Sequence, residues 1–62
     1  MANICRQAAL RAYFGLRERG RDETAAFDAA VAVYQFYHPE TPAVDSIDLV
    51  DRWIEEKDRE QA

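Results

Sequence analysis

The feature that most limits what this chain can fold into is its length of 62 residues combined with a single cysteine, Cys5. A domain of this size buries only about 60% of the surface that its unfolded chain exposes, so its core supplies little stability. One cysteine cannot form a disulfide within the chain. Stability must therefore come from tight helix packing, from self-association or from a partner.

The composition is typical of a packed globular domain. Hydrophobic residues make up 48% of the chain and charged residues 32%, which is too apolar for intrinsic disorder. No apolar run approaches the roughly 18 residues of a membrane span, and Arg6 and Arg11 interrupt the apolar stretch that a signal peptide would need. We therefore expect a single domain over residues 1–62, located in the cytoplasm and not in a membrane.

The charges are divided unevenly along the chain. Residues 1–21 carry five arginines and one glutamate, whereas residues 22–62 carry eleven acidic and three basic residues, so a net charge of +4 precedes one of −8. Such a division indicates either that two parts of the fold complement each other or that each part presents its own charge to a partner. The sequence leaves both alternatives open.

Residues 3–19 form the first predicted helix, because the segment is rich in Ala, Leu, Arg and Gln. Asn3 suits the N-cap position, and Gly20 suits the end of the helix. At 100° per residue the segment has two apolar faces. The first face contains Cys5, Ala8, Ala9, Ala12 and Leu16, and the second contains Leu10 and Phe14 among Arg6, Gln7, Arg17 and Arg21.

Residues 23–37 form the second predicted helix, with Asp22 as its N-cap and Pro39 as the residue that stops it. The segment is apolar over most of its circumference, so we expect it to be central in the fold. One stripe contains Ala26, Ala29, Ala30, Val33 and Tyr37, a neighbouring stripe contains Phe27, Val31 and Tyr34, and only Asp28, Ala32 and Gln35 resemble a solvent face.

Residues 38–42 form a linker with two prolines, and residues 43–60 form the third predicted helix. Thr41 with Pro42 can open this helix, or Asp45 or Ser46 can cap a later start. Either start leaves the predicted faces unchanged. The core stripe contains Ala43, Ile47, Val50 and Ile54 with Trp53 beside them, and an acidic stripe contains Asp48, Asp51, Glu55 and Asp58.

The predicted fold class is therefore all-α, with three short helices. No alternation of apolar and polar residues with the period of a strand competes with the helical periodicity. Connections of two to six residues favour antiparallel neighbours. The arrangement is either an antiparallel three-helix bundle or a helical hairpin with the third helix packed across it.

The sequence offers little for catalysis. Cys5 and the single histidine, His38, are the only pair that combines a nucleophile with a base. Cys5 lies on the stripe of small residues in the first helix, where a free cysteine commonly serves as a core residue. Neither an oxyanion-binding loop nor a third orienting group is visible. We therefore predict that the protein is not an enzyme.

The sequence also predicts no metal and no cofactor. One cysteine and one histidine cannot complete a zinc site within one chain. The acidic stripe on residues 48–58 spaces its carboxylates along a rigid helix that cannot wrap an ion, so it reads as a solvated face. The two glycines, Gly15 and Gly20, lack the spacing of a phosphate-binding loop.

Nucleic acid is a less favoured partner than protein. The second helix is too apolar to face a groove of DNA, and the carboxylates of the third helix would repel phosphates. If nucleic acid is bound at all, the first helix must bind it. Its arginines are Arg6, Arg11, Arg17, Arg19 and Arg21. A further alternative is that the third helix mimics phosphate and binds a basic protein.

The leading hypothesis is a regulatory or protein-interaction module that binds another protein or itself, as a homodimer, through apolar faces of the first and second helices. A three-helix unit needs one apolar face per helix, and both of these helices carry more. Aromatic residues and arginine are enriched at interfaces. The candidate contact residues are Leu10, Phe14, Arg17, Arg21, Phe36 and Tyr37. The alternative is that they all pack within one monomer, with the arginines paired to Asp48, Asp51 and Glu55.

Overall fold

The computed structural model describes residues 4–61 and contains three α-helices joined by short loops. α1 spans Ile4–Glu18, α2 spans Glu23–Tyr37 and α3 spans Ala43–Gln61, and the described residues contain no strand. The predicted all-α class and the three predicted helices are confirmed. Asn3, the predicted N-cap of the first helix, lies outside the described residues.

Local signals set the boundary between α1 and α2. Gly20 adopts a φ of 88°, the left-handed conformation that glycine tolerates best. This turn lets the N–H of Arg21 donate to the carbonyl of Leu16 at 3.0 Å, and the N–H of Gly20 to that of Arg17 at 3.0 Å, which is the Schellman ending of a helix. α2 then begins with Asp22 as its N-cap, whose carboxylate accepts from the N–H of Ala25 at 2.8 Å.

The start of α3 departs from one of the two expected alternatives. The carbonyl of Pro42 accepts the first helical hydrogen bond, from the N–H of Ser46 at 3.1 Å, so the helix starts early. Ser46 is therefore inside the helix and fully buried, and its hydroxyl also donates to the carbonyl of Pro42 at 3.2 Å. A later start capped by Asp45 or Ser46 is wrong.

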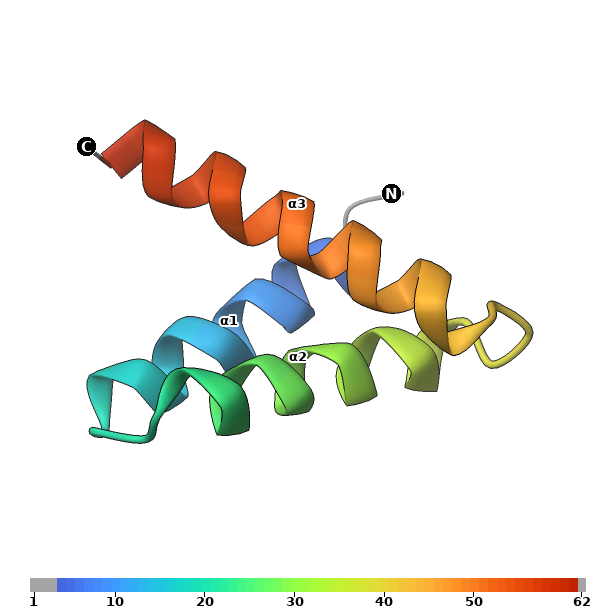
Figure 1. The fold of residues 1–62 in the computed structure, drawn as a ribbon, viewed down its shortest axis with the longest axis horizontal. Coiled ribbons are helices and arrows are strands. Elements are labelled where there is room, and N and C mark those ends of the chain that lie inside the picture. Colours follow the sequence, from blue (N-terminus) through green and yellow to red (C-terminus); the bar gives the residue numbers. More distant parts are fainter. Residues whose placement is uncertain (1–3, 62) are drawn as a thin grey trace.

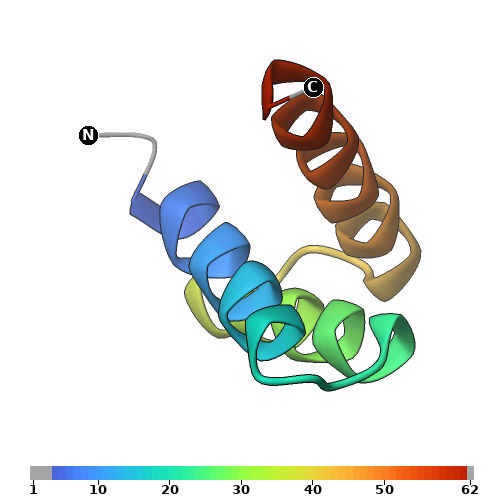
Figure 2. The same ribbon diagram turned by 90° about the vertical axis from the view of Figure 1, so that its left-hand side faces the viewer.

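The helices are arranged as a hairpin crossed by a third helix (Figure 1). α1 and α2 run antiparallel and side by side, and α3 returns in the direction of α1 at an oblique angle to both (Figures 1 and 2). α3 lies near α1 at the start of α1, and the two helices diverge toward their C-terminal ends. The molecule therefore has a closed end at residues 4–6, 34–38 and 53–56, and an open end at residues 10–17, 23–27 and 57–60.

The core lies where the three helices meet. α1 and α2 approach each other through three alanines, Ala9, Ala26 and Ala30, which are completely buried. Small side chains at a helix contact let the two axes come close together. The remaining apolar core side chains are larger, and they are Tyr13 of α1, Tyr34 of α2, and Val50 and Ile54 of α3.

The predicted core stripe of α3 is correct for Val50 and Ile54 and wrong for its first two residues. Ile47 was expected in the core but is 46% exposed, because α3 docks through Ser46, Val50 and Ile54, a ridge of residues four apart. Ala43, which shares the predicted stripe with Ile47, is exposed as well. Tyr37, one of the predicted contact residues, is also 46% exposed, since α2 ends there and the chain turns away into the loop.

Candidate functional site

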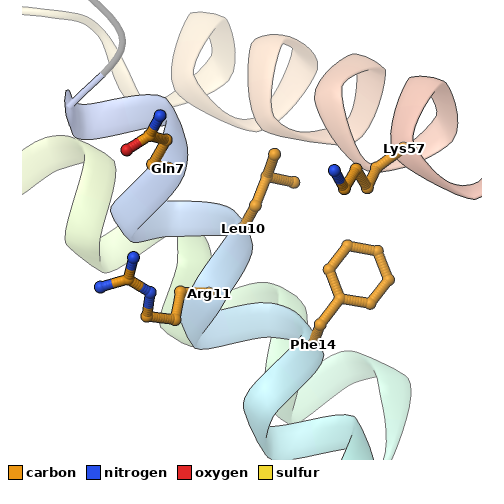
Figure 3. A pocket seen from close by; sticks show the side chains of 5 residues that line it. All are labelled: Gln7, Leu10, Arg11, Phe14 and Lys57. Atoms are coloured by element: carbon orange, nitrogen blue, oxygen red, sulfur yellow. The ribbon is translucent and has the colours of Figure 1, made fainter.

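The open end of the molecule contains a groove between α1 and the last turns of α3. Figure 3 shows Leu10 and Phe14 projecting from α1 toward α3, while Lys57 reaches from α3 toward them. Gln7 and Arg11 line the α1 side of the groove. Its volume of about 330 Å³ is at the lower limit of ligand pockets, and it is open to solvent. Such a shape suits a few side chains of a partner better than an enclosed small molecule.

The helical period explains why Leu10 and Phe14 face α3. Ala9 and Tyr13 are buried, and Leu10 and Phe14 each follow them by one residue, which rotates them by 100° around α1. Leu10 and Phe14 are themselves four residues apart and so share a face. Both are half-buried. The second apolar face predicted for the first helix therefore exists, and α3 covers it incompletely.

The aromatic ring of Phe14 is held by its neighbour on the helix. The Phe14 ring meets the Tyr13 ring edge to face, with centroids 4.9 Å apart. Aromatic pairs in this geometry add about 0.5–1.5 kcal/mol beyond the area they bury. Phe14 therefore lines the groove while its ring packs against Tyr13.

Charges of opposite sign lie on the two sides of the open end. The α1–α3 groove is basic, with Arg11 and Lys57 beside its apolar residues. On the α2 side, one hollow is lined by Glu23, Thr24, Phe27 and Asp51, and another by Tyr13, Phe14, Arg17, Glu23 and Asp58. The α2–α3 side is therefore predominantly acidic, and Phe14 lies between the two.

The ionisation of Tyr13 responds to this environment. Burial raises the pKa of the Tyr13 phenol above its ordinary value, and the carboxylate of Glu23 raises the pKa further. Arg17 lowers it, while Asp58 and Asp51 add small increases. The buried phenol beneath the open end is thus surrounded by more negative than positive charge.

The predicted contact residues fall into two groups in space. Leu10, Phe14 and Arg17 line adjoining parts of the open end. Arg21 follows in the turn after α1, where its carbonyl accepts a hydrogen bond from the Arg17 guanidinium at 3.1 Å. Phe36 and Tyr37 lie at the last turn of α2, at the closed end, with their rings 5.5 Å apart. The six residues do not form one site.

The alternative in which the arginines pair with Asp48, Asp51 and Glu55 is wrong. Among the described side chains one arginine makes an ion pair between helices, Arg6 with Glu56 at 3.2 Å. Asp48 pairs instead with Arg52 of its own helix at 2.9 Å. Four arginines remain exposed on and after α1, and they are Arg11, Arg17, Arg19 and Arg21.

Sequence reasoning did not name two residues that the structure places at these surfaces, Lys57 and Val44. Lys57 was not predicted as a site residue, because a charged residue near the end of a helix is normally exposed to solvent. In the structure its aliphatic chain lines the groove. Val44, which is 71% exposed, and Ile47 form an apolar pair on the surface of α3. The exposure of Val44 was predictable from the sequence, because Val44 lies outside the predicted core stripe of the third helix and so has no buried position to occupy.

The closed end brings together the one nucleophile–base pair of the sequence. His38 Nε2 lies 3.2 Å from Cys5 Sγ, although the two residues are 33 positions apart. The His38 ring stacks on Tyr34 at a centroid distance of 4.7 Å, and Tyr34 in turn meets Trp53 edge to face at 5.5 Å. In the tautomer with an unprotonated Nε2, the imidazole accepts a hydrogen bond from the Cys5 thiol. Stacking on an aromatic ring, rather than a carboxylate, orients this histidine.

The same cluster continues to the surface through Arg6. Its guanidinium lies 6.0 Å from the centroid of the Trp53 ring and pairs with Glu56. Within residues 4–60, no group of three or more potential metal ligands comes together. Cys5 and His38 could supply two ligands to an ion, which is fewer than a structural zinc site requires.

Two further findings bear on the class of protein. In the part of the chain that the structure describes, none of the helices combines the length and the apolar character needed to cross a membrane. No protein-family model, no curated protein and no solved structure matches this chain.

Proposed function

We propose that this chain is a non-enzymatic protein-interaction module whose α1–α3 groove binds an amphipathic helix with acidic flanks. The observation that carries the proposal is the half-exposed Leu10–Phe14 face, flanked by Arg11 and Lys57. Helix-in-groove recognition uses apolar anchors spaced three or four residues apart, and charges at the rim select the partner. Leu10 and Phe14 provide two such anchor points on the side of the groove.

The size of the groove sets the expected strength of binding. Full burial of a leucine or a phenylalanine is worth about 1.5–3 kcal/mol, and part of that burial is already present in the free protein. Association also costs translational and rotational freedom, so the surplus from two anchors is small. The module should therefore bind weakly and reversibly, with a Kd of about micromolar or above. Such affinities suit a regulatory contact.

The experiment is a titration of the ¹⁵N-labelled protein with a designed helical peptide that carries leucines three and four residues apart between aspartates. We expect the largest amide shift changes at Leu10, Phe14 and Lys57. Phe14→Ala should weaken binding about tenfold. The matched control is Phe36→Ala, because Phe36 is 80% exposed at the other end of α2 and should leave binding unchanged.

The distribution of shift changes decides the proposal. Changes centred on Phe36 and Tyr37 would move the binding site to the closed end. An unchanged affinity of Phe14→Ala would remove the groove from the site altogether. A peptide with lysines in place of the aspartates tests the charge rule, and it should bind at least about tenfold more weakly.

A second candidate is an accessory role in binding nucleic acid, and the exposure of Arg11, Arg17, Arg19 and Arg21 favours it. Arginine presents a planar set of donors that matches phosphate oxygens. Binding of this kind weakens steeply as the salt concentration rises, because counterions are released from the nucleic acid. Arg17→Ala combined with Arg21→Ala should then abolish binding. Absence of binding to DNA and RNA at low salt would exclude this candidate.

A further inference from the structure

A hollow at the open end receives side chains from all three helices. It is lined by Tyr13, Phe14 and Arg17 of α1, Glu23 of α2 and Asp58 of α3, and we call it the Tyr13 hollow. Its volume of about 330 Å³ equals that of the α1–α3 groove. Phe14 lines both, but carboxylates outnumber basic groups in the hollow, whereas the groove is basic. The two therefore suit different ligands.

Tyr13 brings an unpartnered hydroxyl to the hollow. The residue is only 6% exposed, yet within residues 4–60 its hydroxyl makes no hydrogen bond. In this part of the chain no side-chain oxygen that is sealed from solvent lacks a partner, so the Tyr13 oxygen is accessible from the hollow that it lines. Buried hydroxyls are normally hydrogen-bonded. The Tyr13 phenol is thus free to bond to a ligand.

The two carboxylates of the hollow are also unpartnered. Within residues 4–60, neither Glu23 nor Asp58 forms an ion pair or a side-chain hydrogen bond. Arg17 supplies the opposing charge, but its guanidinium donates to the carbonyl of Arg21 at 3.1 Å, in the turn after α1. Burial and then Glu23 raise the pKa of the Tyr13 phenol despite the opposing effect of Arg17, which agrees with an excess of negative charge.

The chemistry of the hollow matches a primary ammonium group. Such a group carries one positive charge and three N–H donors, and it has no acceptor. Tyr13, Glu23 and Asp58 offer oxygen acceptors from three different helices, and the Phe14 ring offers an apolar surface for the carbon chain of an amine. A metal ion fits less well, because within residues 4–60 no group of three or more potential metal ligands comes together.

We infer that the Tyr13 hollow binds a primary ammonium group, which hydrogen-bonds to the phenol oxygen of Tyr13 and to the carboxylates of Glu23 and Asp58. The ammonium belongs to a free alkylamine or to the lysine side chain of another protein. The inference goes beyond the proposed function, because it concerns a second ligand of opposite charge and uses neither Arg11 nor Lys57 of the groove.

The test is a titration of the ¹⁵N-labelled full chain with n-butylammonium chloride, with the ionic strength held constant by sodium chloride. We expect saturable amide shift changes, largest at Tyr13, Phe14, Glu23 and Asp58. The Kd should be about millimolar, because both carboxylates are exposed. Tetramethylammonium chloride carries the same charge without an N–H donor, and it should bind at least about threefold more weakly.

A second amine identifies the source of the ammonium group. Nα-acetyl-lysine methylamide presents the lysine side chain with a peptide backbone on either side. Tighter binding of this compound than of n-butylammonium would assign the site to a lysine of another protein. Equal or weaker binding would assign it to a free amine.

Two variants remove the acceptors of the hollow. Tyr13→Phe deletes only the hydroxyl, and it should weaken binding at least about threefold. Because this hydroxyl has no partner within residues 4–60, the change should leave stability at neutral pH unaltered in urea denaturation. Glu23→Gln with Asp58→Asn keeps the shape and removes both charges, and it should weaken binding at least about fivefold. The matched control is Asp28→Asn with Glu40→Gln, at two exposed positions outside the hollow.

The outcomes decide the inference independently of the groove. It would be overturned by Tyr13→Phe binding n-butylammonium as tightly as the wild type, or by a control pair that weakens binding as much as the hollow pair. Tetramethylammonium that binds equally well, or shift changes spread over exposed carboxylates without saturation, would overturn it too. Failure of the acidic peptide to bind beside Arg11 and Lys57 would contradict the proposed function and leave the ammonium site standing.

Discussion

The two ends of this molecule differ in how closely the side chains of the three helices pack against one another. At the closed end, Cys5, Tyr34, His38 and Trp53 contact each other across all three helices. At the open end, α3 diverges from the hairpin, and Phe14 remains half-exposed between surfaces of opposite charge. The closed end thus has a cluster of contacts across the three helices, with Phe36 and Tyr37 exposed on its surface, whereas the open end has a groove in which Leu10 and Phe14 are only half-covered.

The sequence of α3 accounts for the difference. Ile54 is the last apolar residue of the helix within the side chains described, and residues 55–60 are all charged. Up to Ile54, buried side chains hold α3 against the hairpin. Beyond Ile54 there is no apolar side chain to bury against Leu10 and Phe14, so hydration of the charges keeps the last turns apart from α1. The groove is the consequence of this run of charges.

The largest effect should follow from removing the last anchor of α3. Ile54→Ala deletes buried methyl groups where α3 leaves the core, which costs about 2–4 kcal/mol of the free energy of unfolding. The matched control is Ile47→Ala on the same helix, whose exposed side chain should cost less than about 1 kcal/mol. Urea denaturation measures both. Equal losses would show that α3 is not anchored through the ridge of Ser46, Val50 and Ile54.

The next test fills the groove at the open end with an apolar side chain from α3. Lys57→Leu places an apolar side chain opposite Leu10 and Phe14, and it should stabilise the fold by about 1 kcal/mol. The same change should weaken binding of the acidic peptide, because the groove is then filled from within and has lost a positive charge. Arg59→Leu serves as the control, since Arg59 is exposed and does not line the groove. A Lys57→Leu variant no more stable than this control would mean that the charges do not hold the end open.

The sequence alone predicted the helix boundaries and one apolar face of α1 correctly. The helix boundaries were predicted correctly from Gly20, Asp22 and Pro39. Helix caps and helix-breaking residues act over a few residues, so they need no tertiary information. The second apolar face at Leu10 and Phe14 was also predicted, since helical period alone places two residues four apart on one side.

The errors arise where tertiary packing selects among neighbouring helix faces. Ser46 and Ile47 are adjacent on α3, and which of them is buried depends on the angle at which α3 crosses the hairpin. Hydrophobicity favoured Ile47, but close packing admitted the smaller Ser46, whose hydroxyl is satisfied by the carbonyl of Pro42. The contact between Cys5 and His38 likewise depends on the register of α1 against α2, which no local pattern encodes.

A smaller effect on the free energy of unfolding should appear at alkaline pH, through the phenol of Tyr13 at the open end. Burial and the nearby Glu23 raise the pKa of Tyr13 in the folded protein, whereas in the unfolded chain this phenol ionises near its ordinary value of about 10. The stability contributed by the neutral phenol is thus complete below pH 10 and is lost as the pH rises through the folded-state pKa. Tyr13→Phe should therefore reduce the loss of stability above pH 10, measured by denaturation at several pH values. The same alkaline loss in both proteins would contradict this account.

The smallest effect concerns the alkylation rate of Cys5 at the closed end. This rate shows whether the thiol is only packed there or is also chemically activated. Cys5 is half-buried and contacts His38, so iodoacetamide should alkylate it about threefold more slowly in the native protein than in the urea-unfolded chain, equivalent to about 0.7 kcal/mol. His38→Ala should bring the native rate closer to the unfolded rate, because it uncovers the sulfur. The opposite result, a native thiol that reacts faster than the unfolded one and slows on His38→Ala, would mean that the imidazole acts as a base for the sulfur. The closed end would then be a chemical site, and the division of roles between the two ends would have to be reversed.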